Sequence, residues 1–434
     1  MPQNNFIRNL LGITDKNITF PDLSEEDLLW IQKKSVKAKV IPARLTYTPL
    51  FCENCGFENT GASIVKYGGK TSDIQLNKTN ETKTFLRLWK QRFMCRNCQS
   101  TFSAKTGLVD SHCFISKNVK FSIARDLQEK SSLTYVAKKN EASPTTVARV
   151  MDDFYQEFQV DTLHLPEALC FDEFKAVKNV AGKMSFIYMD AQTKKVIDIV
   201  ANRQLNHLET YFHRFPLEVR KRVKWIVIDM YAPYKSLIKS VFPHAQIIVD
   251  RFHIVQHISR AMNQTRIRVM NSFCTKDKED LKKYRRLKNN WKLLLKDKNQ
   301  LNYQDYKWRR SFRRVLCETE MVEELLSFSE ELRRHYELFQ DFLWGIRHKD
   351  LSEVFSIIYS NQTKINKNFT TVLKSFQTFA DPIWNALNQS YSNGPLECFN
   401  NHIKVLKRVA YGYRSFKRLK QRIMIVQGKI FPTI

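Results

Sequence analysis

The stretch VKWIVIDMYAPY, residues 223–234, carries the strand signal from which the rest of the chain can be interpreted. Residues 225–228 (WIVI) form a short apolar run between a charged lead-in and a proline, which predicts a buried strand. The segment from Pro233 to Val241 has helical spacing and starts with a residue suited to a first helical turn. Asp229 stands where the strand would end. Because ligands of α/β sheets bind beyond the carboxyl ends of strands, Asp229 is a candidate catalytic carboxylate; the alternative is that it only caps the next helix.

The residues around this stretch continue the pattern of short apolar runs and helices. Residues 168–171 lead into Asp172, and residues 245–249 end at Asp250. Two further runs, 184–189 and 195–201, are interpreted as strands joined by a turn, and residues 205–215 as a helix. Three strands in hairpin-like succession, then strands separated by helices, predict a mixed sheet with helices packed on it. Asp250 would end a neighbouring strand and is a candidate for a supporting role.

The charge balance of the chain favours a polyanionic partner. Lysine and arginine number 71 against 43 acidic residues, so the 434-residue chain carries a net charge of +28. The excess is also clustered, which weighs against the alternative of a merely basic soluble protein. Hydrophobic residues make up 43% of the chain, which excludes global disorder. No window approaches ~18 uninterrupted apolar residues, and the first residues lack the basic start of a secretory signal, so we expect no membrane span and a cytoplasmic, nucleoid-associated location.

Four of the nine cysteines form two Cys-x-x-Cys pairs, Cys52 with Cys55 and Cys95 with Cys98. Each such turn presents two thiolates to one metal ion, and two turns complete a tetrahedral zinc site. Four cysteine ligands leave no position for water, so the zinc would be structural; the alternative is a set of unpaired buried thiols. Residues 63–69 and 84–94, between the pairs, are predicted to form strands joined by a polar loop.

Residues 132–154, which follow a predicted helix at 119–130, have the layout of a helix, a turn and a second helix. Ser143 would be the N-cap of the second helix and Pro144 its first residue. In a DNA-binding helix-turn-helix the second helix enters the major groove, and an ordinary helical hairpin is the alternative. The side chains that would face DNA are Thr145, Thr146 and Arg149.

From about residue 263 to residue 385 the chain is predicted to be helical throughout. Apolar residues keep helical spacing at 325–343 and at 369–379 and would form core stripes. The first half is densely basic with interleaved aromatic residues, as in KKYRR (282–286) and KWRR (307–310). Such segments can hold phosphate and stack on splayed bases, or they are solvated helix faces with buried aromatic rings; the residues leave both interpretations open.

The sequence SNGPLE, residues 392–397, is a break followed by a predicted helix start. Glu397 would lie near the positive end of that helix, where a carboxylate is favourable for electrostatic reasons alone. Lys404 and Arg408 would share its face of the helix, and no acidic residue follows Glu397 in the sequence. A carboxylate at the head of a basic stripe suggests metal chemistry at a phosphodiester. Two strand-end carboxylates and a third on a helix can hold two divalent cations, and oxygen ligands suit Mg²⁺.

The chain resembles insertion-sequence transposases of the DDE class, of the ISL-three type. The resemblance extends from about Cys52 to Phe431, and the segments that carry it are FDEF (171–174), VIDM (227–230) with Tyr234, VDRFH (249–253), SNGPLECFNNHIKVLKRVAYGYRSF (392–416) and the cysteine segment FMCRNCQSTF. It implies an RNase H-like catalytic domain interrupted by a helical insertion before the last acid. The implied catalytic residues are Asp172, Asp229 and Glu397, with Mg²⁺ or Mn²⁺ as cofactor.

We therefore expect a multidomain α+β and α/β protein that contains a zinc-binding module, a helix-turn-helix, an RNase H-like mixed sheet with helices and an all-α insertion. The expected boundaries are 1–48 for an N-terminal segment, 49–115 for the zinc module, 116–165 for the helix-turn-helix, 166–262 and 386–434 for the two parts of the catalytic domain, and 263–385 for the insertion. Such a protein would bind double-stranded DNA at terminal inverted repeats and target sites, as a homodimer, and would cleave and join strands. The alternatives are a non-catalytic DNA-binding regulator derived from a transposase, and a metal-dependent nuclease.

Overall fold

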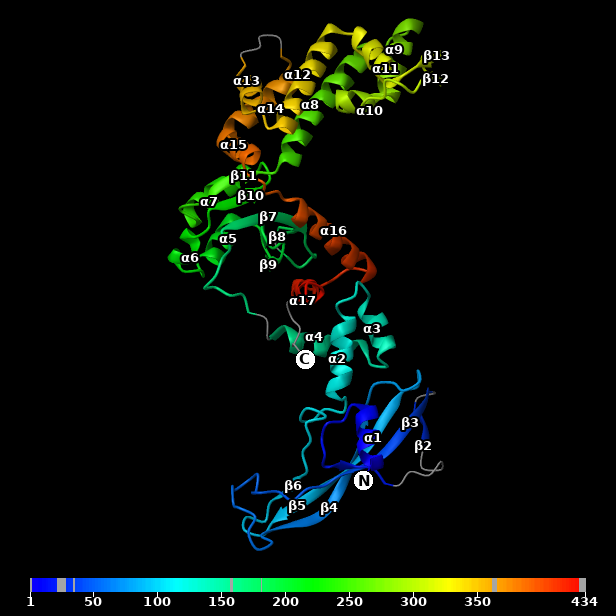
Figure 1. The fold of residues 1–434 in the computed structure, drawn as a ribbon, viewed down its shortest axis with the longest axis vertical. Coiled ribbons are helices and arrows are strands. Elements are labelled where there is room, and N and C mark those ends of the chain that lie inside the picture. Colours follow the sequence, from blue (N-terminus) through cyan, green and yellow to red (C-terminus); the bar gives the residue numbers. More distant parts are fainter. Residues whose placement is uncertain are drawn as a thin grey trace. The chain divides into compact units, whose positions relative to one another are not determined.

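The computed structural model describes residues 2–21, 29–33, 36–156, 159–180, 182–360 and 365–428, and Figure 1 shows their fold. The chain divides into two compact units. Unit 1 comprises Met1–Gln159 and Ile403–Ile434, and unit 2 comprises Val160–His402. The sequence-based boundaries group residues 386–434 together, whereas the structure assigns the residues from Ile403 onward to unit 1.

Unit 2 is built on a five-stranded sheet with the order β11-β10-β7-β8-β9. Strand β10 lies parallel to both β7 and β11, whereas β8 is antiparallel to β7 and β9. The sheet is therefore mixed, as the sequence predicts, and it is consistent with an RNase H-like domain. Its strands are β7 (Ala168–Lys175), β8 (Met184–Asp190), β9 (Val196–Val200), β10 (Trp225–Ile228) and β11 (Gln246–Val249).

One face of this sheet is covered by three helices, α5 (Leu205–Phe212), α6 (Leu217–Lys221) and α7 (Ala232–Val241). Alternate strand residues such as Phe171 and Ile228 point into this core and are fully buried there with Phe212 of α5. Since successive side chains of a strand point to opposite faces, Asp172 is directed to the other face, where α16 (Gly394–Val409) begins. The burial of alternate strand residues on the helix-covered face thus determines which face of the sheet Asp172 points to.

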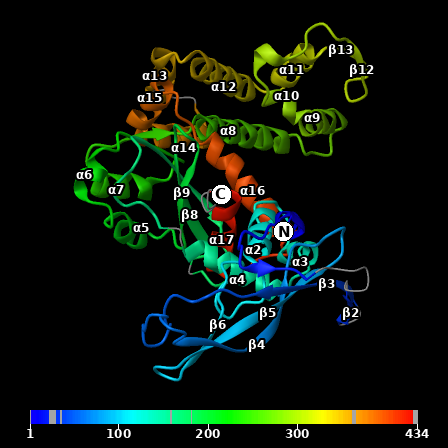
Figure 2. The ribbon, with the colours of Figure 1, turned by 60° about the horizontal axis from the view of Figure 1, so that its bottom comes forward.

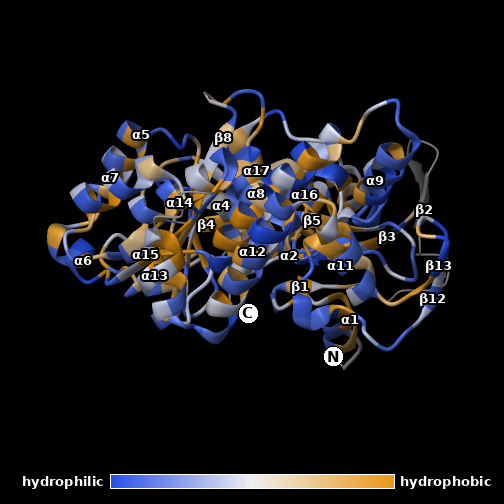
Figure 3. Cartoon of the chain, turned by 90° about the horizontal axis from the view of Figure 1, so that it is seen from above, coloured by the Kyte–Doolittle hydropathy of each residue, from blue (hydrophilic) through white to orange (hydrophobic). Residues whose placement is uncertain are grey.

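A helical insertion separates the sheet strands from α16. It starts with the long helix α8, which leads out of the sheet and packs against α12 and α14 (Figure 2). Hydrophobic and hydrophilic residues alternate in stripes along helices such as α12 (Figure 3), and the buried stripe includes Leu332, Phe339 and Phe342. The helices are α8 (Arg251–Ser272), α9 (Lys278–Asn289), α10 (Trp291–Leu294), α11 (Glu318–Ser327), α12 (Glu330–His348), α13 (Leu351–Tyr359), α14 (Lys367–Thr378) and α15 (Ala380–Asn388), with a 3₁₀ turn at Lys298–Gln300.

The prediction of an all-α insertion is wrong at one place, because β12 (Lys307–Arg309) and β13 (Arg314–Leu316) form an antiparallel hairpin. A turn precedes the hairpin, in which the side chain of Asn302 accepts hydrogen bonds from the backbone of Gln304 and Asp305. This side chain offers the backbone an alternative to helical hydrogen bonds.

Unit 1 contains a six-stranded sheet whose main path is β1-β3-β5-β4, with β2 beside β3 and β6 beside β5. Ile13 and Phe20 share its hydrophobic core with strand residues such as Leu86 and Leu88. Residues 22–34 have the spacing of a short amphipathic helix, but Leu29–Lys33 form strand β2, and residues 22–28 lie outside the described residues. The elements are α1 (Pro2–Leu11), β1 (Ile18–Thr19), β3 (Val36–Leu45), β4 (Ile64–Gln75), β5 (Thr84–Cys95) and β6 (Thr101–Ser103).

The second part of unit 1 is a group of four helices, α2 (Lys117–Asp126), α3 (Leu133–Lys139), α4 (Pro144–Gln156) and α17 (Phe416–Val426). Helix α17 packs on α4, where Arg418 of α17 pairs with Asp152 at 2.7 Å. Arg422 is fully buried and donates to the carbonyl oxygens of Leu127, Glu129 and Ser131 beyond the end of α2. Two basic residues of the C-terminal segment therefore hold this helical group together.

Candidate active site

The first acid of the candidate site, Asp172, lies inside β7, which continues to Lys175, and not at the end of a strand as the sequence predicts. Two hydrogen bonds hold its carboxylate. Its Oδ1 accepts from the backbone N–H of Glu173 at 2.7 Å, and its Oδ2 accepts from Nδ2 of Asn400 at 2.7 Å. The sequence analysis missed Asn400, although it follows Glu397 by one helical turn and so shares its face of α16. This amide orients the Asp172 carboxylate from the helix that carries the third acid.

The second and third acids, Asp229 and Glu397, lie on either side of His253. The imidazole Nε2 is 3.0 Å from Oδ1 of Asp229 and 3.3 Å from Oε1 of Glu397. His253 belongs to the first turn of α8, three residues after Asp250, within a segment that the resemblance already marks. The hydrogen bond to Asp229 raises the pKa of His253 above its usual value.

The three acids repel one another in the absence of a cation. The pKa of Asp172 is raised to about 7, chiefly by burial and also by the negative charges of Asp229 and Glu397, although the hydrogen bonds from Glu173 and Asn400 act in the opposite direction. Such a strongly shifted carboxyl with a specific charge partner is typical of functional sites. The three carboxylates offer hard oxygen ligands, which are the ligands that divalent cations such as Mg²⁺ prefer.

Asn393 fixes the start of α16 to the sheet. Its side chain is fully buried and donates from Nδ2 to the carbonyl oxygen of Phe171 at 2.9 Å. Its backbone N–H donates to Oδ2 of Asp250 at 2.5 Å, and Oδ1 of Asp250 accepts from the N–H of Phe252. Asp250 thus caps α8 and anchors the turn before Glu397, which gives this residue a structural role beside the acids. Both contacts join positions that are distant in the sequence.

We expect Asn393→Ala to displace Glu397 and to lower both stability and activity. The substitution leaves the buried carbonyl of Phe171 without its partner, which costs about 1–3 kcal/mol of the free energy of unfolding. Denaturant unfolding measures this loss, and a cleavage assay below the unfolding midpoint measures the effect on activity. Asn388→Ala, at an exposed amide at the end of α15, is the control. Equal stability of the two variants would contradict the anchoring role of Asn393.

A cavity of about 310 Å³ opens beside the acids and is lined by Asp172, Asp229, Glu173, Arg203, Tyr231, Tyr234, Met184 and Phe171. Glu173 is the acid that strand alternation directs away from Asp172, and its carboxylate has partners of its own. It pairs with Arg203 and accepts from the hydroxyl of Tyr234 at 2.5 Å. Because these two donors already satisfy it, Glu173 belongs to the wall of the cavity and not to the group of three acids.

The four paired cysteines converge at the end of the unit 1 sheet. Their sulfur atoms all lie within 4.8 Å of one another, and in the described residues no other group of three or more metal-ligating side chains is as close; the three acids and His253 are spaced more widely. Cys52 and Cys98 are 3.7 Å apart and Cys55 and Cys95 are 3.9 Å apart between sulfurs. Ligands about 2.3 Å from a tetrahedral zinc ion are separated by about 3.8 Å, so the cluster is compatible with structural zinc. A hydrogen bond with Ser100 lowers the pKa of Cys98 to about 6, which favours the thiolate.

The residues predicted to face DNA occupy two helices. Helix α4 begins at Pro144, as predicted, and the Ser143 hydroxyl accepts from the N–H of Thr146 at 3.0 Å. Thr145 and Arg149 are exposed, whereas Thr146 is half-buried and its hydroxyl contacts Ser143. The remaining two, Lys404 and Arg408, are exposed on α16.

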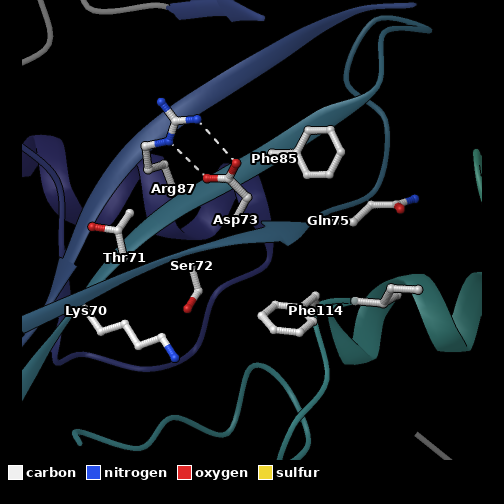
Figure 4. Close-up of a pocket in the computed structure, with 9 residues that line it drawn as sticks. Lys70, Thr71, Ser72, Asp73, Gln75, Phe85, Arg87 and Phe114 are labelled. Carbon is white, nitrogen blue, oxygen red and sulfur yellow. Dashed lines mark hydrogen bonds and ion pairs between the residues drawn. The ribbon is translucent and has the colours of Figure 1, made fainter. Parts of the chain in front are cut away.

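A second cavity, of about 630 Å³, lies on the outer face of the unit 1 sheet (Figure 4). Its lining includes one carboxylate, Asp73, which is joined to Arg87 by two hydrogen bonds of 2.9 and 3.2 Å. Phe85 and Phe114 line the same cavity near Gln75. With a single acid that is already paired, this cavity lacks the group of acids found beside β7 and β10.

The comparison with known families assigns this arrangement to a class of protein. A transposase family, the ISL-three type of DDE transposases, matches residues 169–423, which include all three acids. The chain belongs to this family. The match spans β7, β10, the insertion and α16, which are the elements that form the candidate site.

Two individual relatives match parts of the chain. The transposase for insertion sequence element IS1001 of Bordetella parapertussis is 24% identical over 254 residues, or 57% of this chain and 58% of that protein. A Lactococcus lactis subsp. lactis protein described as an ATP-dependent protease is 51% identical over 113 residues, or 26% of this chain and 36% of that protein. The matched regions thus cover less than two thirds of either relative. Among the described helices, none has the length and apolar character that crossing a membrane requires.

Proposed function

We propose that this protein is the DDE transposase of an insertion sequence, which cleaves the ends of its element and joins them to target DNA. The observation that carries the proposal is the meeting of Asp229 and Glu397 at His253, with Asp172 linked to the same helix through Asn400. These contacts join residues far apart in a chain that belongs to a transposase family. Asp172, Asp229 and Glu397 would hold Mg²⁺ or Mn²⁺.

The chain's own side chains have separable roles in this proposal. The three carboxylates provide the negative charge and oxygen ligands, Asn400 orients Asp172, and His253 balances the charge of Asp229 and Glu397. When bound, two divalent cations activate the attacking oxygen and stabilise the leaving oxygen of an in-line displacement at phosphorus. Water and then a DNA 3′-hydroxyl serve as nucleophiles, so no serine or tyrosine nucleophile is required.

Unit 1 is proposed to bind the ends of the element, with zinc held by the four cysteines and with α4 as the recognition helix of a helix-turn-helix. The support is the exposure of Thr145 and Arg149 at the start of α4, beside buried Val147 and Val150 that hold the helix in place. Exposed Lys404 and Arg408 would contact phosphate. We expect a homodimer on DNA, in keeping with the two ends of such an element.

A strand-transfer assay tests the proposal. Labelled duplexes with the ends of the element are incubated with the full chain, target DNA and Mg²⁺ or Mn²⁺, and the products are separated on a denaturing gel. A transposase yields both nicked 3′ ends and joined products. A nuclease would yield cleavage without joining, and a regulator would bind without either product; both outcomes would contradict the proposal.

We expect Arg149→Ala to weaken binding to element ends. If the guanidinium reads a base edge, the substitution should reduce the binding free energy by about 1–3 kcal/mol and relax the sequence preference at one base pair. Contact with phosphate would instead weaken all sequences alike and reduce the salt dependence of binding by about one counterion. Electrophoretic mobility shifts at several salt concentrations measure both quantities. An unchanged affinity and salt slope would show that α4 is not the recognition helix.

A further inference from the structure

The β12–β13 hairpin of the insertion exposes a large apolar surface. Trp308 and Val315 are directly opposite each other in the hairpin, and both face solvent, with 66% and 53% of their surfaces exposed. Tyr303 and Tyr306, just before the hairpin, are also exposed. Single exposed apolar residues are ordinary, but a contiguous apolar patch marks an interaction site.

Basic residues predominate around this apolar pair, although two of them have acidic partners, Lys307 with Asp305 and Arg314 with Glu324. Residues 306–317 contain five lysine and arginine residues and no acid. Arg310 and Arg313 in the connecting turn are exposed, and neither has a carboxylate partner within the described part of the chain. An aromatic ring flanked by unpaired cations is the combination that holds a nucleic acid through stacking on bases and contact with phosphates.

The hairpin is firmly attached through its other face. Phe312 of the turn is buried beneath the guanidinium of Arg286, 4.9 Å from the ring centre, and Arg286 donates to the carbonyl oxygen of Ser311 at 3.1 Å. Arg286 is itself paired with Glu324 of α11 at 2.6 Å. In Figures 1 and 2 the hairpin lies at the outer end of the insertion, beside α10 and α11. Trp308 is therefore presented on a fixed support.

The turn also keeps an arginine where glycine would be conformationally easier. Arg313 has a φ of 54°, in the left-handed region that side chains other than glycine seldom adopt. The strained residue is one of the two exposed cations without an acidic partner.

We propose that the β12–β13 hairpin is a DNA-binding wedge, in which Trp308 stacks on a base that has left its ordinary stack and Arg310 and Arg313 hold the adjacent phosphates. The inference rests on the proposed function only in taking DNA as the partner. Inserted side chains of this kind unstack a base step and bend the duplex, which exposes more DNA to the protein. The hairpin would thus supply a second DNA contact from the insertion.

Two variants of the full chain test the wedge. Trp308→Ala should lower the affinity for duplex DNA about 5- to 150-fold, the range for the loss of one stacked base. Arg313→Gly should lower the affinity for all sequences and reduce the salt slope by about one, while leaving the protein at least as stable, because glycine suits the turn. A lower affinity of Arg313→Gly thus cannot be attributed to misfolding.

Each variant has a matched control in unit 2. Trp384→Ala removes another half-exposed tryptophan, on α15. Lys349→Gly removes another positive charge at a left-handed position, after α12. Both controls should bind DNA like the wild type. The base contact is read independently with 2-aminopurine placed at successive positions of the duplex, whose fluorescence should rise at one position with the wild type and not with Trp308→Ala.

The outcomes separate this inference from the proposed function. If the wild type cleaves and joins element ends but Trp308→Ala and Arg313→Gly bind DNA and affect 2-aminopurine as the wild type does, the wedge is refuted and the transposase proposal stands. If both variants lose affinity while the wild type shows no cleavage, the wedge stands and the transposase proposal fails. A change in self-association of Trp308→Ala without any change in DNA binding would assign the patch to a protein contact and also overturn the wedge.

Discussion

Asp229→Asn is expected to lower DNA cleavage and strand transfer by several orders of magnitude while leaving binding to the element ends intact. The substitution keeps the shape of the side chain but removes its charge, and an amide is a poorer ligand for a hard cation. Asp229 also lies 3.0 Å from Nε2 of His253, so the loss of its charge weakens the principal contact of the imidazole. Asp172 and Glu397 alone would not hold both cations.

Binding should survive because the proposed DNA contacts lie elsewhere, in α4 and on the exposed basic residues of α16. One negative charge fewer near phosphate would, if anything, tighten it. The measurement is a gel assay with labelled ends in Mg²⁺ or Mn²⁺ that scores binding and cleavage on one preparation. Asp190→Asn is the matched control, because Asp190 ends β8 of the same sheet but only accepts hydrogen bonds from the turn residues Gln192 and Thr193. A variant that cuts at the wild-type rate would show that Asp229 is no more than a strand-end residue.

Cys95→Ser is expected to release zinc, unfold the region of residues ~50–115 and weaken binding to the element ends. Cys95 is fully buried at the end of β5, opposite Ile64 of β4. Its substitution therefore changes the packing of the sheet core as well as the cysteine cluster. A structural zinc ion contributes to folding directly, by about 10–16 kcal/mol of apparent binding free energy in small zinc domains at neutral pH. Removal of one of four ligands therefore has a larger effect than an ordinary core substitution.

Metal analysis of the purified protein, thermal unfolding and mobility shifts with element ends test this expectation together. Cys113→Ser is the control, because Cys113 belongs to the same unit but lies outside the group of four sulfurs. The control should retain zinc and binding. Full DNA binding by a wild-type preparation that contains no zinc would overturn the metal site and leave four unmetallated thiols.

The local elements around the candidate site follow from patterns within the sequence. The apolar run of β10 and its terminal Asp229 are visible within a dozen residues, as are the two cysteine pairs and the Ser143-Pro144 helix start. These features depend on side chains a few residues apart, so periodicity and capping preferences suffice to find them. The transposase family was also recognisable from such segments, and the family match confirms it.

Contacts between segments that are distant in the sequence could not be predicted from local patterns. Asn393 and Asn400 contact β7 across more than 200 positions, and no local pattern distinguishes them from other amide side chains. The hairpin at Lys307–Leu316 replaced the expected helix because Phe312 and Leu316 find a place in the core of the insertion. Helix α17 joined the helical group of unit 1 rather than the sheet because Arg418 pairs with Asp152 of α4 and Arg422 finds three carbonyl acceptors in the residues after α2.

The sequence by itself thus determined the five strands of the unit 2 sheet, the start of α4, the cysteine pairs and the positions proposed for the three acids, because each depends on the chemistry of a short segment. Only the tertiary structure decided that His253 lies between Asp229 and Glu397 and that Trp308 is exposed. It also decided that Asn393 and Asn400 hold α16, the helix of Glu397, to β7. The physical reason is that burial and long-range hydrogen bonds are properties of packed surfaces. A polar side chain gains its role only when the partner that satisfies it is brought within hydrogen-bonding distance by the fold.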